Sequence, residues 1–384
     1  MVPAKTNDGR YIDPALGALA GEGAQQQVKP RDERMEEIAP KPWNRVPLAM
    51  EQDPTYYERP LLKPSVWGID IPLYYFVGGA AGAALSIGAA VQLACIGDPC
   101  RAELRHFSAH CHWVGIIGST VGAALLIHDL GKPSRFFNMV RVFRPTSPMN
   151  MGAWILGGAA PTAIATGLFI NRGGLLGVIG ETTGYLAGGF GTALAGYTGV
   201  LVSSSAIPVW QQARRWMPVL FMASAMTSAA SLLDLWYEDE RANRITGIFG
   251  AAGRIGELVA SRRVESAASE IPKVGEPFRK GATSILWKAS TALTAASLVL
   301  SLVPAKSRRT RQVAGVLGAL GSLALRFAVY YITNASARDP RASFQLQRAK
   351  PRSAESGSAS AQIVEAASRS EGPVPAAFPR PALH

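Results

Sequence analysis

The stretch GGAAGAALSIGAA (78–90) consists almost entirely of small residues, inside an apolar run from about residue 70 to residue 96. A helix needs roughly 20 apolar residues to cross a bilayer, and small residues let helices approach closely in lipid. A glycine-rich nucleotide loop is the alternative, but no strand precedes these glycines and they lie within the apolar run. The run therefore predicts a transmembrane helix that packs tightly against its neighbours.

Outward from this run, the sequence contains further apolar runs of similar length and one weaker run. All of them together cover roughly 70–96, 107–129, 151–170, 182–203, 216–236, 244–261, 282–303 and 312–333. The weak run, 244–261, carries Arg254 and Glu257, which can pair on one helix face. We interpret it as a polar-faced span packed inside the protein; a helix lying on the membrane surface is the alternative. The sequence thus predicts an all-α integral membrane protein with about eight transmembrane helices.

The polar parts of the chain fit this prediction. Charged residues make up only 17% of the sequence, against roughly 25% in soluble chains. The formal charge is +12, and its Lys and Arg residues favour loops beside anionic lipid over nucleic-acid binding. With an even number of spans both termini share one side, called side A here; the opposite side is side B. Lys and Arg are slightly more numerous in the side A loops, which leans toward a cytoplasmic side A.

The ends of the chain differ from its middle. Residues 1–55 are polar and residues 341–384 are rich in Ser, Ala, Pro and Arg, so both are predicted to be largely disordered. Residues 56–340 form the predicted membrane domain. No apolar core of a signal peptide occurs in residues 1–60, so we expect the first span to direct insertion.

Polar residues in or beside spans are candidates for function because they are costly in lipid. On side A, the order of the spans gathers Asp70, Tyr74, His128, Asp129 and Tyr197. Such a cluster can hydrogen-bond a quinone carbonyl and exchange its protons. Helix-end capping is the alternative role for the two aspartates.

A second set of polar residues is a candidate proton path, with His112 and Asp234 toward side B and Glu257 and Arg326 toward side A. Its members are His112, Asp234, Arg254, Glu257 and Arg326. His112 is placed to relay protons toward Asp234. The alternative is that the charged members simply pair with one another.

The sequence offers no ligand set for a redox group. Cys95, Cys100 and Cys111 fall short of the four thiolates of a ferredoxin-type cluster, and we interpret them as small apolar fillers. Apart from the C-terminal His384, the histidines belong to one span and its ends, so no second helix supplies a haem ligand. No cluster has the spacing of metal ligands either. If the protein handles electrons, a partner must deliver them.

One loop is recognisable. DLGKPSRFFNMVRVFRPTSPMNMGAW (129–154) resembles the signature loop of the NrfD/PsrC family, the membrane anchors of polysulfide-reductase-type and related molybdopterin oxidoreductases. The similarity extends over about 56–341. It includes YYERPLLKPSVWGIDIPLYYFVGGAAG (56–82), YTGVLVSSSAIPVWQQARR (197–215) and LRFAVYYITNASARDPR (325–341).

The resemblance implies two four-helix bundles in a bacterial inner (cytoplasmic) membrane, with a menaquinone or ubiquinone pocket in the first bundle. It implies a four-cluster ferredoxin-like iron–sulfur subunit as neighbour, and usually a molybdopterin catalytic subunit beyond it. In the family, polar residues of the first helix and a tyrosine of the fourth contact the quinone. Asp70 and Tyr74 lie in the first region and Tyr197 fits the tyrosine, although the first helix departs from the family's Asn and His pattern.

The resemblance also suggests a role for the signature loop. Arg135, Arg141 and Arg144 are expected to dock an acidic surface of the iron–sulfur subunit; contact with lipid phosphates is the alternative. Prolines in the loop predict a stiff shape. We therefore expect a quinone- or quinol-binding subunit of a respiratory oxidoreductase, with proton translocation left open and no catalytic residue assigned. A purely structural anchor is the alternative. A transporter is disfavoured because no repeat is visible.

Overall fold

The computed structural model describes residues 11–13, 18–20, 61–63, 65, 67–96, 100–235, 239–303 and 307–349. The chain divides into two units, residues 1–59 and 60–384. In the first, strand β1 (Tyr11–Asp13) pairs antiparallel with strand β2 (Ala18–Ala20). These strands are the part of the predicted disordered extension, 1–55, that the structure describes; the remainder lies outside the described residues.

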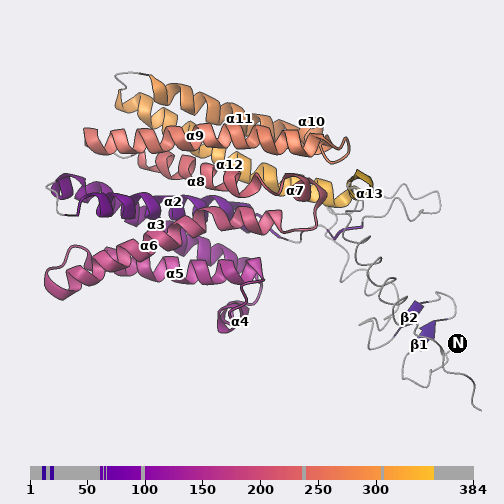
Figure 1. Ribbon diagram of the computed structural model, residues 1–384, viewed down its shortest axis with the longest axis horizontal. Helices are drawn as coiled ribbons and strands as arrows, with labels where there is room; N and C mark the ends of the chain where they lie inside the picture. The colour runs from indigo at the N-terminus through magenta and orange to yellow at the C-terminus, as the bar shows by residue number, and fades with distance from the viewer. Residues whose placement is uncertain are drawn as a thin grey trace, which may run out of the picture. The chain divides into compact units, whose positions relative to one another are not determined.

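The described part of the second unit is helical (Figure 1). Its helices are α2 (Asp70–Ala94), α3 (Cys100–Asp129), α4 (Arg135–Arg141), α5 (Pro148–Phe169), α6 (Gly174–Ser203), α7 (Pro208–Ala213), α8 (Met217–Leu233), α9 (Glu240–Ser269), α10 (Glu276–Arg279), α11 (Gly281–Leu302), α12 (Arg308–Arg338) and α13 (Pro340–Ala349).

Six described helices are long and apolar enough to cross a membrane: α2, α3, α5, α6, α11 and α12. The predicted helical membrane protein is confirmed to that extent. Helix α8 is apolar but shorter. Helix α9 reaches far beyond the predicted run 244–261, because a helix satisfies its own backbone hydrogen bonds and can continue past the apolar segment.

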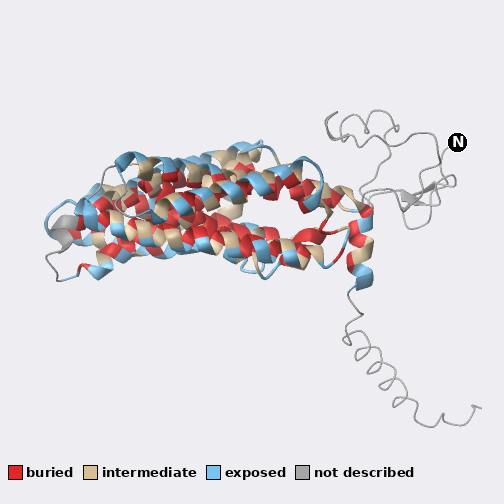
Figure 2. Ribbon diagram, turned by 90° about the horizontal axis from the view of Figure 1, so that it is seen from above, coloured by how far each residue is buried: buried red, intermediate tan, exposed pale blue. Residues whose placement is uncertain are grey.

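The long helices run side by side, and α2 lies among several of them (Figure 1). It packs against α3, α6, α8 and α12, while α5 packs on α6 and α11 packs on α12 and α9. Figure 2 shows buried residues along the faces where helices meet. Large apolar side chains such as Trp113, Ile117 and Leu168 point outward, as expected for surfaces that face lipid.

Helices α2 and α6 approach each other closely at two glycines. A Cβ atom on Gly82 would lie 2.5 Å from the backbone oxygen of Gly191 and 2.7 Å from the backbone nitrogen of Ala195. A Cβ on Gly191 would in turn lie 2.6 Å from the oxygen of Gly82. Neither backbone can yield as a flexible side chain would, so the contact requires glycine at both positions.

Two expectations about the helix ends are wrong. Cys95, interpreted as an apolar filler, is disulfide-bonded at the side B end of α2. Residues 341–349 were assigned to a disordered tail, but they belong to α13. That helix buries Ala342 and Leu346, and its Gln345 accepts a hydrogen bond from the Lys273 backbone at 3.1 Å. Burial of these side chains stabilises a segment whose composition alone predicts disorder.

The glycine contact predicts a specific sensitivity to bulk. We expect Gly82→Val to destabilise the purified protein by about 1–3 kcal/mol or more, because the side chain would force α2 and α6 apart. Gly189→Val on α6 is the matched control, since nothing lies within 4 Å of a Cβ at that position. Thermal unfolding in mild detergent measures both variants. Equal losses in the two would contradict the proposed close contact.

Candidate functional site

Tyr74 of α2 and Tyr197 of α6 meet on side A, where their hydroxyl groups hydrogen-bond to each other. Both rings fit because neighbouring positions lack side chains. A Cβ on Gly78 or on Gly122 would lie 3.2 Å from the Tyr74 ring, and one on Gly152 would lie 2.9 Å from the Tyr197 hydroxyl oxygen. Glycines of three helices thus make room for two phenols in the protein interior.

A small cavity of about 60 Å³ lies beside this tyrosine pair. Polar groups reach it from Tyr74, Tyr75, Asp129 and Tyr197, and its other walls are mainly apolar. The apolar lining residues are Trp67, Ile71, Leu126, Leu130, Met139, Met149, Ala153 and Leu201. The volume suits one or a few water molecules. Met139 and Met149 belong to the signature loop region, so this loop covers the cavity.

The remaining predicted side A residues lie next to the cavity. His128 and Asp70 approach within 3.2 Å through Nδ1 and Oδ2, but His128 is 79% exposed and neither residue lines the cavity. An exposed pair of this kind contributes little to stability. Asp129 has two roles: its Oδ1 accepts a hydrogen bond from the Gly68 backbone at 3.1 Å, and it also lines the cavity.

Sequence reasoning missed Tyr75. Its side chain is buried, it lines the cavity, and its hydroxyl has no hydrogen-bond partner among the described residues. Only the adjacent Tyr74 was predicted as a site residue. A buried phenol normally finds a polar partner, so the doublet Tyr74–Tyr75 was the available signal. Trp67 was also missed; its backbone oxygen accepts a hydrogen bond from Tyr330.

The signature loop owes its shape largely to Asn150. The Asn150 Oδ1 accepts a hydrogen bond from the Arg144 backbone at 2.6 Å, and its Nδ2 donates to the Val142 backbone oxygen at 2.8 Å. Arg141 and Arg144 are exposed, as is Phe143 between them. The side chain of Arg135 lies outside the described part of the structure. A stiff loop was predicted from its prolines, but the visible restraint is this amide.

The second set of polar residues forms separate contacts. Arg254 does not pair with Glu257, the first possibility; it pairs with Asp234 of the α8 end at 3.3 Å, as the alternative of pairing among the charged members allowed. Glu257 instead accepts hydrogen bonds from Thr294 at 2.8 Å and Ser322 at 3.0 Å. Polar groups of neighbouring helices lie closer to Arg254 and Glu257 than these two side chains lie to each other on successive turns of α9.

Arg326 and His112 complete that set. Arg326 donates to the Phe221 backbone oxygen at 2.9 Å, and its guanidinium lies 4.0 Å from the centre of the Phe221 ring. His112 is buried, and neither ring nitrogen has a hydrogen-bond partner within the described residues. A direct hydrogen bond from His112 to Asp234 is therefore not part of the described structure. Nor do the described residues include a group of three or more His, Cys, Asp or Glu that could hold a metal ion.

Comparison with known proteins adds a family to this geometry. Comparison with curated proteins gives no match. Residues 60–335 match the family model described as polysulphide reductase, NrfD, which covers the described helices from α2 almost to the end of α12. Members of this family are membrane subunits of molybdoenzyme complexes. Since the match spans well over half of the chain, this protein belongs to the NrfD family of polysulphide reductase membrane proteins.

Proposed function

We propose that this protein is the quinone- or quinol-binding membrane subunit of a respiratory oxidoreductase, exchanging electrons with a docked iron–sulfur subunit. The observation that carries the proposal is the hydrogen-bonded hydroxyl pair of Tyr74 and Tyr197 beside a cavity on side A. As part of the proposal, all long helices including α8 and α9 cross a bacterial inner membrane, in two groups of four. Menaquinone or ubiquinone is then the substrate of the site.

The chemistry of quinone reduction fits these residues. A quinone takes up two electrons and two protons, and its carbonyl oxygens are hydrogen-bond acceptors. The hydroxyl groups of Tyr74, Tyr75 and Tyr197 are donors that can hold a carbonyl and stabilise charge developing on its oxygen. Asp129 is half-buried at the end of α3 and lines the cavity, so its carboxylate can exchange protons between the cavity and water.

The size of the cavity adds a requirement. About 60 Å³ is less than a quinone ring occupies, so the site must widen when the ring enters. Met139 and Met149 line the cavity from the signature loop region, and methionine side chains repack readily. We propose that movement of this loop opens the site.

A purely structural anchor is the alternative function. An anchor has no need of buried hydroxyl groups. The hydroxyl of Tyr75, which has no hydrogen-bond partner among the described residues, costs free energy unless a ligand or water satisfies it. This observation favours a binding site.

Removal of one hydroxyl group tests the site. We expect Tyr197→Phe to lower quinone-linked turnover of the complex by roughly tenfold to a hundredfold, as loss of a hydrogen bond to a developing charge would. The complex should still assemble, because the ring remains. Tyr331→Phe is the control, since Tyr331 is 44% exposed and does not line the cavity. Steady-state turnover with a soluble quinone analogue measures both; undiminished turnover in Tyr197→Phe would remove this residue from the site.

The same proposal assigns docking of the partner to the signature loop. Exposed Arg141 and Arg144 flank an apolar patch that includes Phe143, which suits an acidic protein surface with an apolar centre. We expect the double change Arg141→Glu and Arg144→Glu to reduce co-purification of the iron–sulfur subunit at least tenfold. Arg309→Glu, an exposed arginine on side B, should leave it intact. Normal co-purification of the double variant would indicate that these arginines meet lipid instead.

The disulfide of Cys95 bears on orientation. Disulfides persist in oxidising compartments, and Cys95 lies at the side B end of α2. We propose that side B faces the periplasm and that the tyrosine site and its partner face the cytoplasm.

A reporter fused to the C-terminus tests this orientation. A green fluorescent protein at that position should fluoresce, because the eight proposed spans would put both termini on side A and the reporter folds in the cytoplasm. Alkaline phosphatase at the same position should be inactive. The reverse pattern, with an active phosphatase and a dark fluorescent protein, would place side A in the periplasm.

A further inference from the structure

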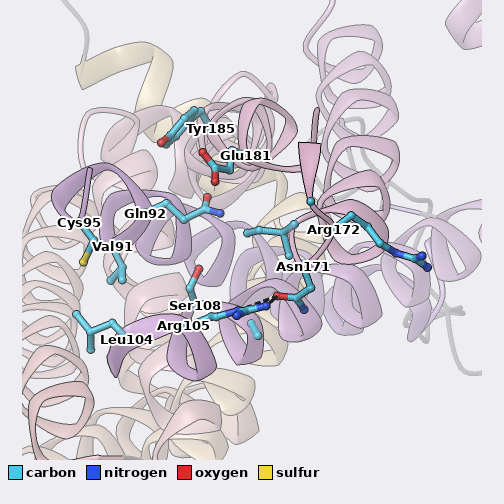
Figure 3. A pocket seen from close by; sticks show the side chains of 13 residues that line it. Val91, Gln92, Cys95, Leu104, Arg105, Ser108, Asn171, Arg172, Glu181 and Tyr185 are labelled. Carbon is cyan, nitrogen blue, oxygen red and sulfur yellow. Dashed lines mark hydrogen bonds between the residues drawn. The ribbon is translucent and has the colours of Figure 1, made fainter. Parts of the chain in front are cut away.

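A larger cavity, of about 590 Å³, lies at the other end of the same helices, on side B (Figure 3). It is formed by the last turn of α2, the first turns of α3 and α6, and the turn between α5 and α6. Gln92 lines this cavity, and Tyr74 lines the first one. At 1.5 Å per residue the two lie roughly 27 Å apart along α2. The side B cavity is therefore separate from the tyrosine site.

Polar groups in the side B cavity lack partners. Both amide atoms of Gln92 and the hydroxyl of Ser108 are buried without a hydrogen-bond partner among the described residues. The Ser108 side chain is 5% exposed. Gln92 is held close to α6 because position 184 is glycine: a Cβ on Gly184 would lie 2.9 Å from the Gln92 Nε2. Buried groups that forgo hydrogen bonds are costly, so a ligand or bound water is expected to satisfy them.

The cavity also presents a positioned positive charge. Arg105 donates to the Asn171 Oδ1 through Nε at 3.0 Å and through Nη2 at 2.8 Å. These bonds fix the plane of the guanidinium, which has five N–H donors and matches the geometry of a phosphate. Arg172 reaches outward at the rim, as Figure 3 shows. Two arginines at one opening favour an anion.

Hydroxyl-binding groups lie away from this charge. Glu181 and Tyr185 enter the cavity from α6, and the side chains of Glu181 and Gln92 point toward one another in Figure 3. The carboxylate of Glu181 does not attract an anionic group of a ligand, but it accepts hydrogen bonds from neutral hydroxyl groups. The cavity thus offers an arginine for one end of a ligand, and amide, hydroxyl and carboxylate groups for the other.

The surroundings point to a lipid as the source of that ligand. Val91, Leu104 and Ile170 line the cavity, and exposed apolar side chains of Leu93, Leu175 and Val178 lie on the adjoining ends of α2 and α6. Helix ends are where headgroups sit in a bilayer. The volume falls within the roughly 300–1,000 Å³ of small-molecule sites.

We propose that the side B cavity is a binding site for the hydroxylated headgroup of an anionic phospholipid. Arg105 binds the phosphate, with Arg172 at the rim. Gln92, Ser108 and Glu181 bind the headgroup hydroxyl groups, and the acyl chains follow the apolar surface of α2 and α6. The proposal does not depend on the quinone site.

The test uses the full-length protein in nanodiscs that contain phosphatidylcholine with a minor fraction of phosphatidylglycerol. After extraction into mild detergent, native mass spectrometry counts the lipids retained per chain. We expect the natural sequence to retain one phosphatidylglycerol in preference to phosphatidylcholine. Arg105→Gln should lower that retention at least about tenfold, as loss of a charge-assisted hydrogen bond would. Arg309→Gln, an exposed arginine on the same side outside the cavity, should retain the lipid.

A second variant and a soluble probe complete the design. Ser108→Ala keeps the fold, because it only removes a hydroxyl group, and should weaken retention of phosphatidylglycerol severalfold. A soluble phosphate ester carries the same chemical groups as the lipid headgroup and is the other possible ligand. Glycerol phosphate at millimolar concentration tests it, and we expect it to displace little of the bound phosphatidylglycerol. Equal retention of the two lipids, equal retention in Arg105→Gln and Arg309→Gln, or full displacement by glycerol phosphate would each overturn the lipid site.

Discussion

The structure depends on the contact between α2 and α6 at Gly82 and Gly191, where two helix backbones touch without intervening side chains. In lipid, the hydrophobic effect does not hold helices together, so packing of this kind has to. The contact also sets the geometry at both ends of the pair. Toward side A it brings the hydroxyl groups of Tyr74 and Tyr197 into hydrogen-bonding distance. Toward side B it brings the side chain of Gln92 close to Gly184.

Buried polar groups differ in how far the protein itself satisfies them. Asp234 and Glu257 each find partners on neighbouring helices, so their contacts join those helices. The hydroxyl of Tyr75 and the amide of Gln92 do not have such partners within the described residues, and both line cavities. Unsatisfied groups beside a cavity are therefore candidates for ligand binding.

Much of this arrangement could be predicted from the sequence. Apolar length gave most of the helices, and counting them placed Tyr74, Asp129 and Tyr197 at one end, where the cavity lies. The misses concern contacts between helices. Local spacing suggested that Arg254 pairs with Glu257, but the partner came from α8. The side B cavity was missed because residues from separate helices and a turn line it. No single segment of the sequence contains a pattern that predicts such a cavity.

The signature loop links two roles that the sequence treated separately. Met139 and Met149 form part of the cavity wall, while Arg141 and Arg144, between them in sequence, face outward. Asn150 ties these parts together through the backbone of Val142 and Arg144. If the proposed partner docks on the arginines, it would also act on the methionines, because both lie on one connected segment. On that proposal, changes in the loop alter docking and cavity together, whereas a change at Tyr197, which lies on α6, acts on the cavity alone.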